Sequence, residues 1–144
     1  MQIEAVAAEI VRPLRAEVLR PGQPAEQLVY EGDERSASRH WAASIDGRVV
    51  SVASVLREGH PREPRPGDWR LRGMASSADV RGQGLGSELL MRCVTYAREQ
   101  NGARLWCNAR IRAVGFYERA GFLVEGELFE IRSIGPHHLM SKAL

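Results

Sequence analysis

The sequence predicts a mixed α+β fold, in which helices lie on the faces of a central sheet. Apolar residues recur at helical spacing in three segments, while the runs between them are typical of strands. The order along the chain is strand, helix, a run of strands, helix, strand, helix and strands. This order is typical of an α+β or mixed α/β sheet.

The chain begins with a short expected strand, Ile3 to Val6, and a helix from Ala7 to Leu19. The apolar face of this helix comprises Ile10, Val11, Leu14 and Val18. Pro13 either kinks the helix or belongs to its first turn. The run Pro-Gly-Gln-Pro at residues 21–24 ends it, and a polar loop follows.

Strands dominate the next segment. Residues 40–45 and 49–56 flank Asp46-Gly47, a dipeptide that strongly favours a two-residue hairpin. The loop from Gly59 to Asp68 contains three prolines, so we expect it at the surface, at the rim of a binding cleft. Trp69 to Ala75 is the next expected strand.

The clearest helix runs from Gly84 to Gln100. Its apolar stripe comprises Leu85, Leu89, Leu90, Cys93, Val94 and Ala97. A short strand is expected at residues 103–107, and a second helix from Arg110 to Ala120, which stops at Gly121. The last strands are expected at residues 122–131 and 138–143, joined through Gly135-Pro136.

The length of 144 residues suits one domain with a buried core, so residues 1–144 are expected to form a single domain. No apolar run approaches the ~20 residues of a membrane-spanning helix. The N-terminus does not read as a signal peptide. Cys93 and Cys107 do not form a CxxC motif and are too few for a disulfide scaffold. We therefore expect a cytoplasmic protein without a membrane partner.

The basic residues are almost all arginine, and Lys142 is the only lysine among 20 of them. Eighteen acidic residues leave a formal net charge of +2, and the arginines are scattered along the chain. A nucleic-acid-binding protein would show a basic stripe or a much larger positive charge. The composition therefore argues against a nucleic-acid partner.

The most informative segment is Val80 to Ser87, where three glycines lie at the start of the clearest helix. Glycines let a ligand approach the backbone, and the free N–H groups of a helix start bind phosphate. A loop of the GxxxxGK[ST] type needs a lysine that is absent here. A GxGxxG dinucleotide fingerprint does not fit, because Gly86 comes one residue early.

The segment does contain the pattern Arg-x-x-Gly-x-Gly, at Arg81, Gly84 and Gly86. This pattern resembles the coenzyme A pyrophosphate loop of GNAT-type N-acetyltransferases. Residues 113–122, AVGFYERAGF, resemble the second signature of that family, an aromatic-Tyr pair followed by a Gly-Phe that opens a strand. The resemblance covers Trp69 to about Glu130. It implies a central, largely antiparallel, splayed sheet with helices on both faces.

The resemblance also implies direct transfer of an acetyl group from acetyl-CoA to an amine. The strand end Met74-Ala75-Ser76 would hold the pantetheine arm, and an N–H of Met74 or Ala75 would stabilise the oxyanion. The pyrophosphate would be wrapped by Arg81, Gly82, Gln83, Gly84, Leu85, Gly86 and Ser87. Tyr117 would protonate the departing thiolate.

One position departs from the family pattern. Many members have an asparagine seven residues before the tyrosine, where this chain has Arg110. Either Asn108 takes the contact with the cofactor, or Arg110 serves a related role.

An acceptor amine must lose a proton before it attacks, so a general base is needed. His137, at the start of the last strand, ranks first; the alternatives are His40, His138, Glu34, Glu130 and a water chain. We expect no metal site. His137 and His138 are adjacent on a strand and point to opposite faces, and no carboxylate or cysteine completes a zinc-like cluster.

The expected acceptor is a small-molecule amine of unspecified identity. Residues 21–39 and 59–68 are expected to shape its pocket. Within them Glu31, Asp33 and Glu34 could attract an amine, and Arg62 and Arg65 could hold a carboxylate. Two alternatives remain: an acyl-CoA-binding sensor or partner module with little catalysis, and a nucleotide-binding module that uses the same loop. The family resemblance also allows a homodimer through sheet edges.

Overall fold

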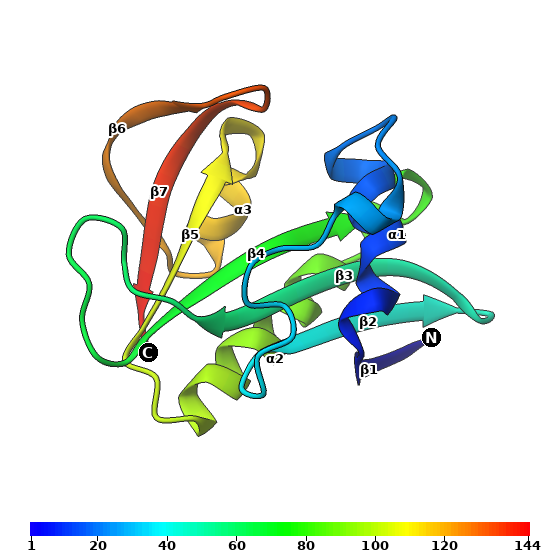
Figure 1. Ribbon diagram of the computed structural model, residues 1–144, viewed down its shortest axis with the longest axis horizontal. Coiled ribbons are helices and arrows are strands. Elements are labelled where there is room, and N and C mark those ends of the chain that lie inside the picture. The colour runs from blue at the N-terminus through cyan, green and yellow to red at the C-terminus, as the bar shows by residue number, and fades with distance from the viewer.

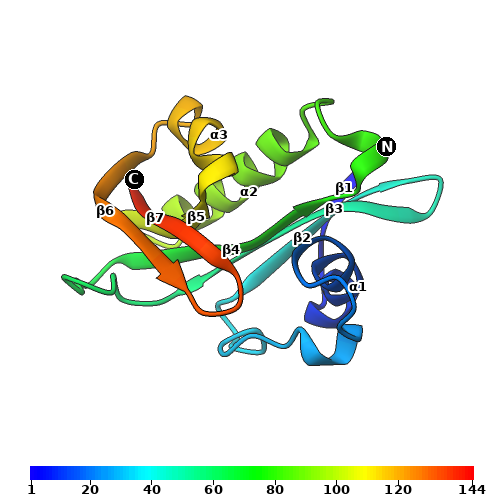
Figure 2. The same ribbon diagram turned by 90° about the horizontal axis from the view of Figure 1, so that it is seen from above.

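The computed structural model describes all residues, 1–144, and is built on one seven-stranded sheet of order β1-β2-β3-β4-β5-β7-β6. Every neighbouring pair is antiparallel except β4 and β5, which are parallel. Helix α1 covers one face of the sheet, and α2 and α3 cover the other (Figure 1, Figure 2). The predicted α+β class and the largely antiparallel sheet with helices on both faces are confirmed.

The first half of the chain follows the predicted order closely. It comprises β1 (Gln2–Val6), α1 (Ala8–Leu19), η1 (Ala25–Gln27), β2 (Arg39–Ile45), β3 (Arg48–Arg57) and β4 (Asp68–Ser76). Pro13 lies well inside α1, so the first-turn alternative is wrong. The φ angles of Asp46 and Gly47 are 50° and 78°, as a type I′ turn requires, and the predicted hairpin is confirmed.

The second half contains η2 (Ala78–Val80), α2 (Leu85–Glu99), β5 (Arg104–Arg110), η3 (Ile111–Ala113), α3 (Val114–Arg119), β6 (Leu123–Ile131) and β7 (Gly135–Ala143). The helix predicted from Arg110 to Ala120 is shorter than expected. Arg110 still belongs to β5, because it pairs with His137 of β7 and stays extended. Gly135 and Pro136 begin β7 rather than join the strands; the turn lies before them, with Ser133 at φ 69°.

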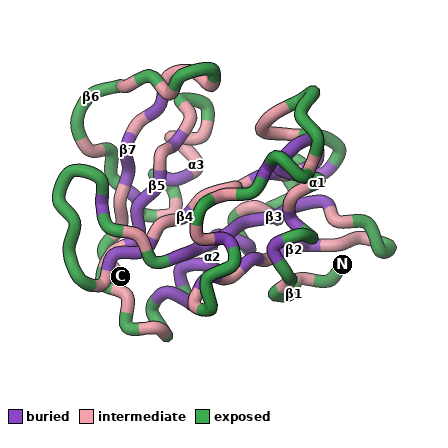
Figure 3. Tube along the Cα trace, in the orientation of Figure 1, coloured by how far each residue is buried: buried purple, intermediate pink, exposed green.

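The core lies mainly between α2 and the sheet. Every residue of the predicted α2 stripe is buried, and Trp69 and Leu105 of the sheet pack in the same cluster. A smaller cluster joins Val11 and Leu14 of α1 to the opposite face. Burial is concentrated on the central strands and α2, whereas the loop after β3 and much of β6 are exposed (Figure 3). None of the helices is long and apolar enough to cross a membrane.

The sheet splays between β4 and β5. These strands pair only from Asp68–Arg70 to Arg104–Trp106 and then diverge, β4 toward the end of α1 and β5 alongside β7 (Figure 1). The register between β3 and β4 also shifts opposite Ala53, where Gly73 has a φ of 67°. The far half of β4 therefore has an edge without a partner strand, as the family resemblance implied.

A buried ion pair fastens the segment after α1 to the sheet. The Arg15 guanidinium donates to both carboxylate oxygens of Asp33, at 2.8 and 3.1 Å, and to the Ser54 hydroxyl. Burial alone would raise the pKa of Asp33, but hydrogen bonds from Arg15 and from the Tyr30 N–H hold it below the usual value. The segment is thereby positioned beside β4.

Candidate active site

A cleft of about 860 Å³ opens where β4 and β5 diverge. Its walls come from the end of α1, from β4 and β5, from the η3–α3 segment and from the β6–β7 hairpin. The expected site residues that line it are Met74, Ala75, Ser76, Arg81, Gly86, Asn108, Tyr117 and His137. Residues far apart in sequence therefore meet in one cavity. The expected roles of these residues stay predictions.

The end of β4 forms the floor of the cleft. Met74, Ala75 and Ser76 lie beyond the last pairing with β5, so one backbone edge of this segment faces the cleft rather than a strand. The Ser76 hydroxyl is 2.7 Å from the Ser51 hydroxyl, and the Ser77 N–H donates to the Val50 carbonyl. These bonds to β3 hold the strand end in place.

The glycine segment presents a row of free donors beside this floor. The backbone N–H groups of residues 81–87 donate to no acceptor in the protein. Gly82 and Gly84 have φ angles of 81° and 82°, and a Cβ at either would meet nothing within 4 Å. Gly84 caps α2, whose first three N–H groups, from Leu85 to Ser87, point out of the helix. The backbone here suits an anion such as a pyrophosphate.

Side chains of the segment play different parts. Arg81 is exposed and its Nε donates to the Ser76 carbonyl at 3.3 Å, which keeps the guanidinium at the cleft. Gln83 reaches back to the Asp79 carbonyl at 3.5 Å. The Leu85 side chain is buried in the core, so only its backbone is available to a ligand. Gly86 lies against Phe116, where an added Cβ would be 3.6 Å from the ring.

Tyr117 lies on α3 and is almost fully buried, with 7% of its surface exposed. Its ring packs edge-on against Phe116 and Phe122. The hydroxyl makes no hydrogen bond to another protein group, and the residue lines the cleft. Burial raises the pKa of Tyr117 well above its usual value, so the hydroxyl stays protonated and can donate.

His137 is also buried, at the start of β7, and lines the same cleft. Its Nδ1 lies 2.8 Å from the Gly135 carbonyl, so Nδ1 carries the hydrogen and donates. In the neutral ring Nε2 then keeps a lone pair and can accept a proton. The Phe129 ring lies beside it across the hairpin, with the ring centroids 6.1 Å apart.

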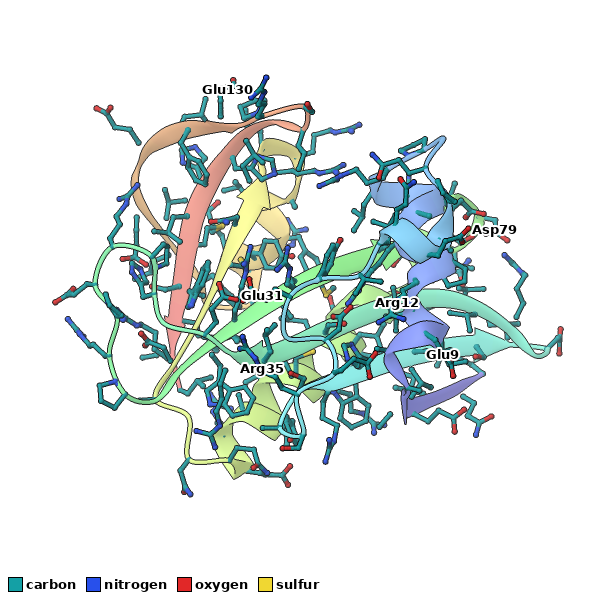
Figure 4. All side chains as sticks on the ribbon, viewed as in Figure 1. Glu9, Arg12, Glu31, Arg35, Asp79 and Glu130 are labelled. Atoms are coloured by element: carbon teal, nitrogen blue, oxygen red, sulfur yellow. The ribbon has the colours of Figure 1, made fainter.

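The other base candidates do not line the cleft. Both ring nitrogens of His40 are engaged, with Ser54 and with the Asp33 carbonyl. Glu34 is paired with Arg12 at 2.9 Å. Glu130 is exposed at the outer rim of β6 (Figure 4), because its neighbours on the strand are the ones that face inward. His138 lies next to His137 on β7 and faces the opposite side.

Asn108 and Arg110 are two residues apart on β5, so their side chains lie on the same face of the strand, and both line the cleft. The Arg110 guanidinium crosses the cleft and donates to the Leu19 carbonyl at the end of α1, at 2.9 Å. Burial, with a contribution from neighbouring Arg20, lowers the pKa of Arg110. Arg110 therefore connects the two walls of the cleft. The side-chain amide of Asn108 makes no hydrogen bond to the protein and is free to bind a ligand.

The prediction that the loop from Gly59 to Asp68 forms a rim of the cleft is wrong. No residue of this loop lines the cleft, because His60 and Arg62 pack it against Glu125 of β6. Arg65 is bonded to Glu63 within the loop, outside the cleft. The β6–β7 hairpin supplies that wall instead, through Phe129, Ile131 and Ile134.

The segment at residues 21–39 contributes only Tyr30 to the cleft, while Arg20 lies just before it. The carboxylates proposed to attract an amine do not line the cleft either. Asp33 is bonded to Arg15, Glu34 to Arg12, and Glu31 is exposed near Arg35. Arg70 and Arg72 of β4 line the cleft and were not foreseen, since single arginines in a strand form no motif.

Two further features bear on the chemistry. Cys93 and Cys107 are buried and free, and burial raises the pKa of the Cys107 thiol to about 12. No group of three or more His, Cys, Asp or Glu side chains lies close enough together to hold a metal ion.

Comparisons with known proteins show the family to which the chain is similar. The acetyltransferase (GNAT) family model matches residues 4–122. The N-acetyltransferase YitI of Bacillus subtilis (strain 168), itself described as uncharacterized, is 33% identical over 144 residues, which are 100% of this chain and 97% of YitI.

Solved structures show the same fold. The IAA acetyltransferase from Bacillus cereus ATCC 14579 has a TM-score of 0.76 at 18% identity, over 99% of each chain. An aminoglycoside 6'-N-acetyltransferase complexed with coenzyme A has a TM-score of 0.74 at 12% identity, over 99% of this chain and 97% of that one. At such identities the similarity to these structures shows the fold alone.

Proposed function

The chain belongs to the GNAT family of acetyltransferases, and from that premise we propose that it transfers the acetyl group of acetyl-CoA directly to the amine of a small-molecule acceptor. The observation that carries the proposal is the row of free N–H groups at residues 81–87, beside a cleft that also contains Tyr117 and His137. Family membership makes the protein an acyltransferase; the acceptor class and the roles of single residues belong to the proposal.

Residues 81–87 would hold the pyrophosphate of acetyl-CoA. Their seven N–H groups lack protein acceptors, the α2 dipole favours negative charge at Leu85, and Arg81 adds a full positive charge. Glycine at 82 and 84 keeps the backbone open to the ligand. Bound acetyl-CoA would supply an acetyl group activated as a thioester.

The far half of β4 would hold the rest of the cofactor. The backbone groups on its unpaired edge at Met74–Ser76 have no partner strand. They would hydrogen-bond to the pantetheine arm in place of such a strand. An N–H of Met74 or Ala75 would stabilise the negative charge that develops on the carbonyl oxygen. Asn108, across the cleft on β5, offers an amide without a protein partner.

Proton transfers would fall to His137 and Tyr117. Nε2 of His137 would accept the proton that the ammonium group loses, directly or through one water, so that the amine nitrogen can attack the thioester carbon. As the C–S bond breaks, the Tyr117 hydroxyl would donate its proton to the departing thiolate. The acylated nitrogen would lose its remaining extra proton to solvent, and the tyrosinate would take one back. Its raised pKa makes this donation weakly driven, so the placement of the hydroxyl matters more than its acidity.

Two measurements test the proposal. Calorimetric titration with CoA, ATP and NAD should show binding of CoA alone; binding of ATP or NAD would favour the nucleotide-binding alternative. Free thiol release from acetyl-CoA should then be screened across amines, amino acids, aminoglycosides, polyamines and peptides. CoA binding without release for any amine would replace the enzyme proposal with a sensor or partner module.

The remaining expectations extend the proposal. One continuous sheet supports a single domain over residues 1–144. A cytoplasmic location, and the lack of nucleic-acid and membrane partners, stay predictions. The homodimer also stays a prediction, which sedimentation at several protein concentrations tests.

A further inference from the structure

The charges around the cleft are of one sign. No aspartate or glutamate lines it, but six arginines do: Arg20, Arg70, Arg72, Arg81, Arg110 and Arg112. A site for a polyamine or an aminoglycoside would need carboxylates to match the several ammonium groups of such a ligand. The cleft instead offers positive charge to whatever lies beside the reacting amine.

Arg72 differs from the other five arginines. Arg70 is paired with Glu58 at 2.9 Å, Arg20 and Arg110 donate to the Leu19 carbonyl, and Arg81 donates to the Ser76 carbonyl. Arg112 is exposed to water. Arg72 alone is partly withdrawn from water and makes no hydrogen bond or ion pair, and its Nε is buried without a partner.

The position of Arg72 is nevertheless fixed. Its guanidinium lies 4.0 Å from the centroid of the Tyr30 ring, which the Arg15 guanidinium also approaches at 4.0 Å. Gly73 allows this arrangement, because a Cβ there would lie 2.9 Å from Arg15 Nε and 3.3 Å from Tyr30. The cation is therefore held in place before any ligand arrives, which lowers the entropic cost of binding an anion.

Positive neighbours leave this cation short of a counterion. Burial, followed by the repulsion from Arg70, lowers the pKa of Arg72 to about 10, so it is still charged at neutral pH. Glu58, the one carboxylate that favours the charged form of Arg72, is already paired with Arg70. A desolvated charge without a partner is costly, and an anionic group from a ligand would remove that cost.

The cofactor's pyrophosphate is not that anion. Arg72 stacks on Tyr30 and neighbours Arg15 of α1, on the face of the sheet opposite α2 and its glycine segment (Figure 2). Arg72 lies two residues before Met74, near the expected thioester position. A group attached to the reacting amine would reach it.

We propose that the acceptor is an amine that also carries a carboxylate, and that Arg72 binds this carboxylate. The proposal rests on the acetyl transfer proposed above and names its substrate class. Arg72 then sets specificity: it selects acceptors with an acid group near the amine and disfavours polycations, which its charge repels.

Matched acceptor pairs test the proposal. Phenylalanine is compared with phenethylamine, histidine with histamine and 4-aminobutyrate with butylamine, by thiol release from acetyl-CoA; phosphoethanolamine with ethanolamine shows whether a phosphate serves as well. The carboxylate-bearing member should have the higher kcat/KM by about tenfold or more in at least one pair. In R72Q this preference should fall to within about twofold, with KM for acetyl-CoA unchanged. The matched control is R92Q, on the exposed side of α2 and outside the cleft, which should keep the preference.

A binding measurement gives an answer without turnover. Protein saturated with CoA is titrated with N-acetylphenylalanine and with neutral N-acetylphenethylamine; the acid should bind more tightly, and R72Q should remove the difference. Equal binding of both, binding of neither, a preference for the decarboxylated amines, or an R72Q effect on acetyl-CoA alone would overturn the role of Arg72. Such results leave the acetyltransferase proposal intact if thiol is released, whereas absence of CoA binding and thiol release refutes that proposal itself.

Discussion

Tyr117 and Tyr96 are both buried, but their hydroxyls have different surroundings. Tyr96 donates to the Ala37 carbonyl at 2.8 Å, whereas the Tyr117 hydroxyl has no protein partner and its residue lines the cleft. In Y117F we expect kcat to fall about 100-fold, because general acids contribute roughly 10²–10⁴-fold, with little change in stability. Y96F should do the reverse: it should lose about 1 kcal/mol of unfolding free energy and keep its kcat. Thiol-release kinetics and urea denaturation check both variants. Unchanged turnover in Y117F would remove the assignment.

His137 is tested in the same way. H137Q retains a side-chain amide that can bond the Gly135 carbonyl but cannot accept a proton, so kcat should fall about 100-fold at neutral pH. The loss should be smaller at high pH, where more of the acceptor arrives as the free amine. H40Q is the matched control, because His40 is engaged with Ser54 and the Asp33 carbonyl outside the cleft; its effect should be on stability. A pH profile of H137Q parallel to the unsubstituted protein would favour a water chain as the base.

Some single residues of the candidate site could be named from the sequence, and others could not. The glycine segment and Tyr117 could be named as candidates because their motifs are local and match a family pattern, and their roles stay predictions. Arg72 was not, since its meaning depends on Tyr30 and on the absence of a nearby free carboxylate, both of which arise from folding. His137 ranked ahead of Glu130 as the base, and the register of the β6–β7 hairpin brings only His137 into the cleft.

Elements with a long regular pattern were predicted best. The α2 stripe buries as expected because six apolar positions recur over four turns. The helix expected at Arg110 was overextended, because the pairing of β5 with β7 is a long-range contact that local propensity does not reveal. The loop at residues 59–68 was assigned to the cleft for the same reason: its contact with β6 is not visible in the sequence.

Asp68 joins that loop to the start of β4 and β5. Its carboxylate accepts from Arg104 Nε at 2.8 Å and from the backbone N–H groups of His60 and Arg65. Burial opposes ionisation, but these bonds outweigh it and lower the pKa of Asp68 to about 2. A lowered carboxyl pKa stabilises the fold above the unfolded value of about 4, and this contribution disappears as the pH falls toward about 2. We expect about 1 to 2 kcal/mol of unfolding free energy to be lost across that range.

D68N should remove this part of the pH dependence. The variant should be less stable at pH 7 and lose less further stability between pH 4 and 2 than the unsubstituted protein. Urea denaturation at several pH values measures the difference. D46N, in the exposed β2–β3 turn, serves as the control and should follow the unsubstituted curve. Parallel curves for D68N would show that Asp68 does not carry the effect.

For the whole molecule, the splay divides the sheet into two parts that share only three residue pairs, Asp68–Arg70 with Arg104–Trp106. The cleft between them is spanned by Arg110, which reaches the end of α1. A ligand that fills the cleft contacts both parts at once and binds only the folded chain. Binding and global stability are therefore linked.

Acetyl-CoA at 100 times its Kd should stabilise the fold by about 2.7 kcal/mol and raise Tm by about 5–10 °C. The amides of residues 81–87, which have no acceptor in the free protein, should exchange hydrogen quickly without the ligand and slowly with it.

R81A should weaken binding about tenfold and so reduce the stabilisation at the same ligand concentration by about 1.4 kcal/mol, while the Tm of the free protein stays the same. R92A, outside the cleft, is the matched control. Thermal unfolding and hydrogen exchange together test whether acetyl-CoA binds at residues 81–87. Stabilisation by acetyl-CoA without protection of these seven amides would mean that the cofactor binds elsewhere.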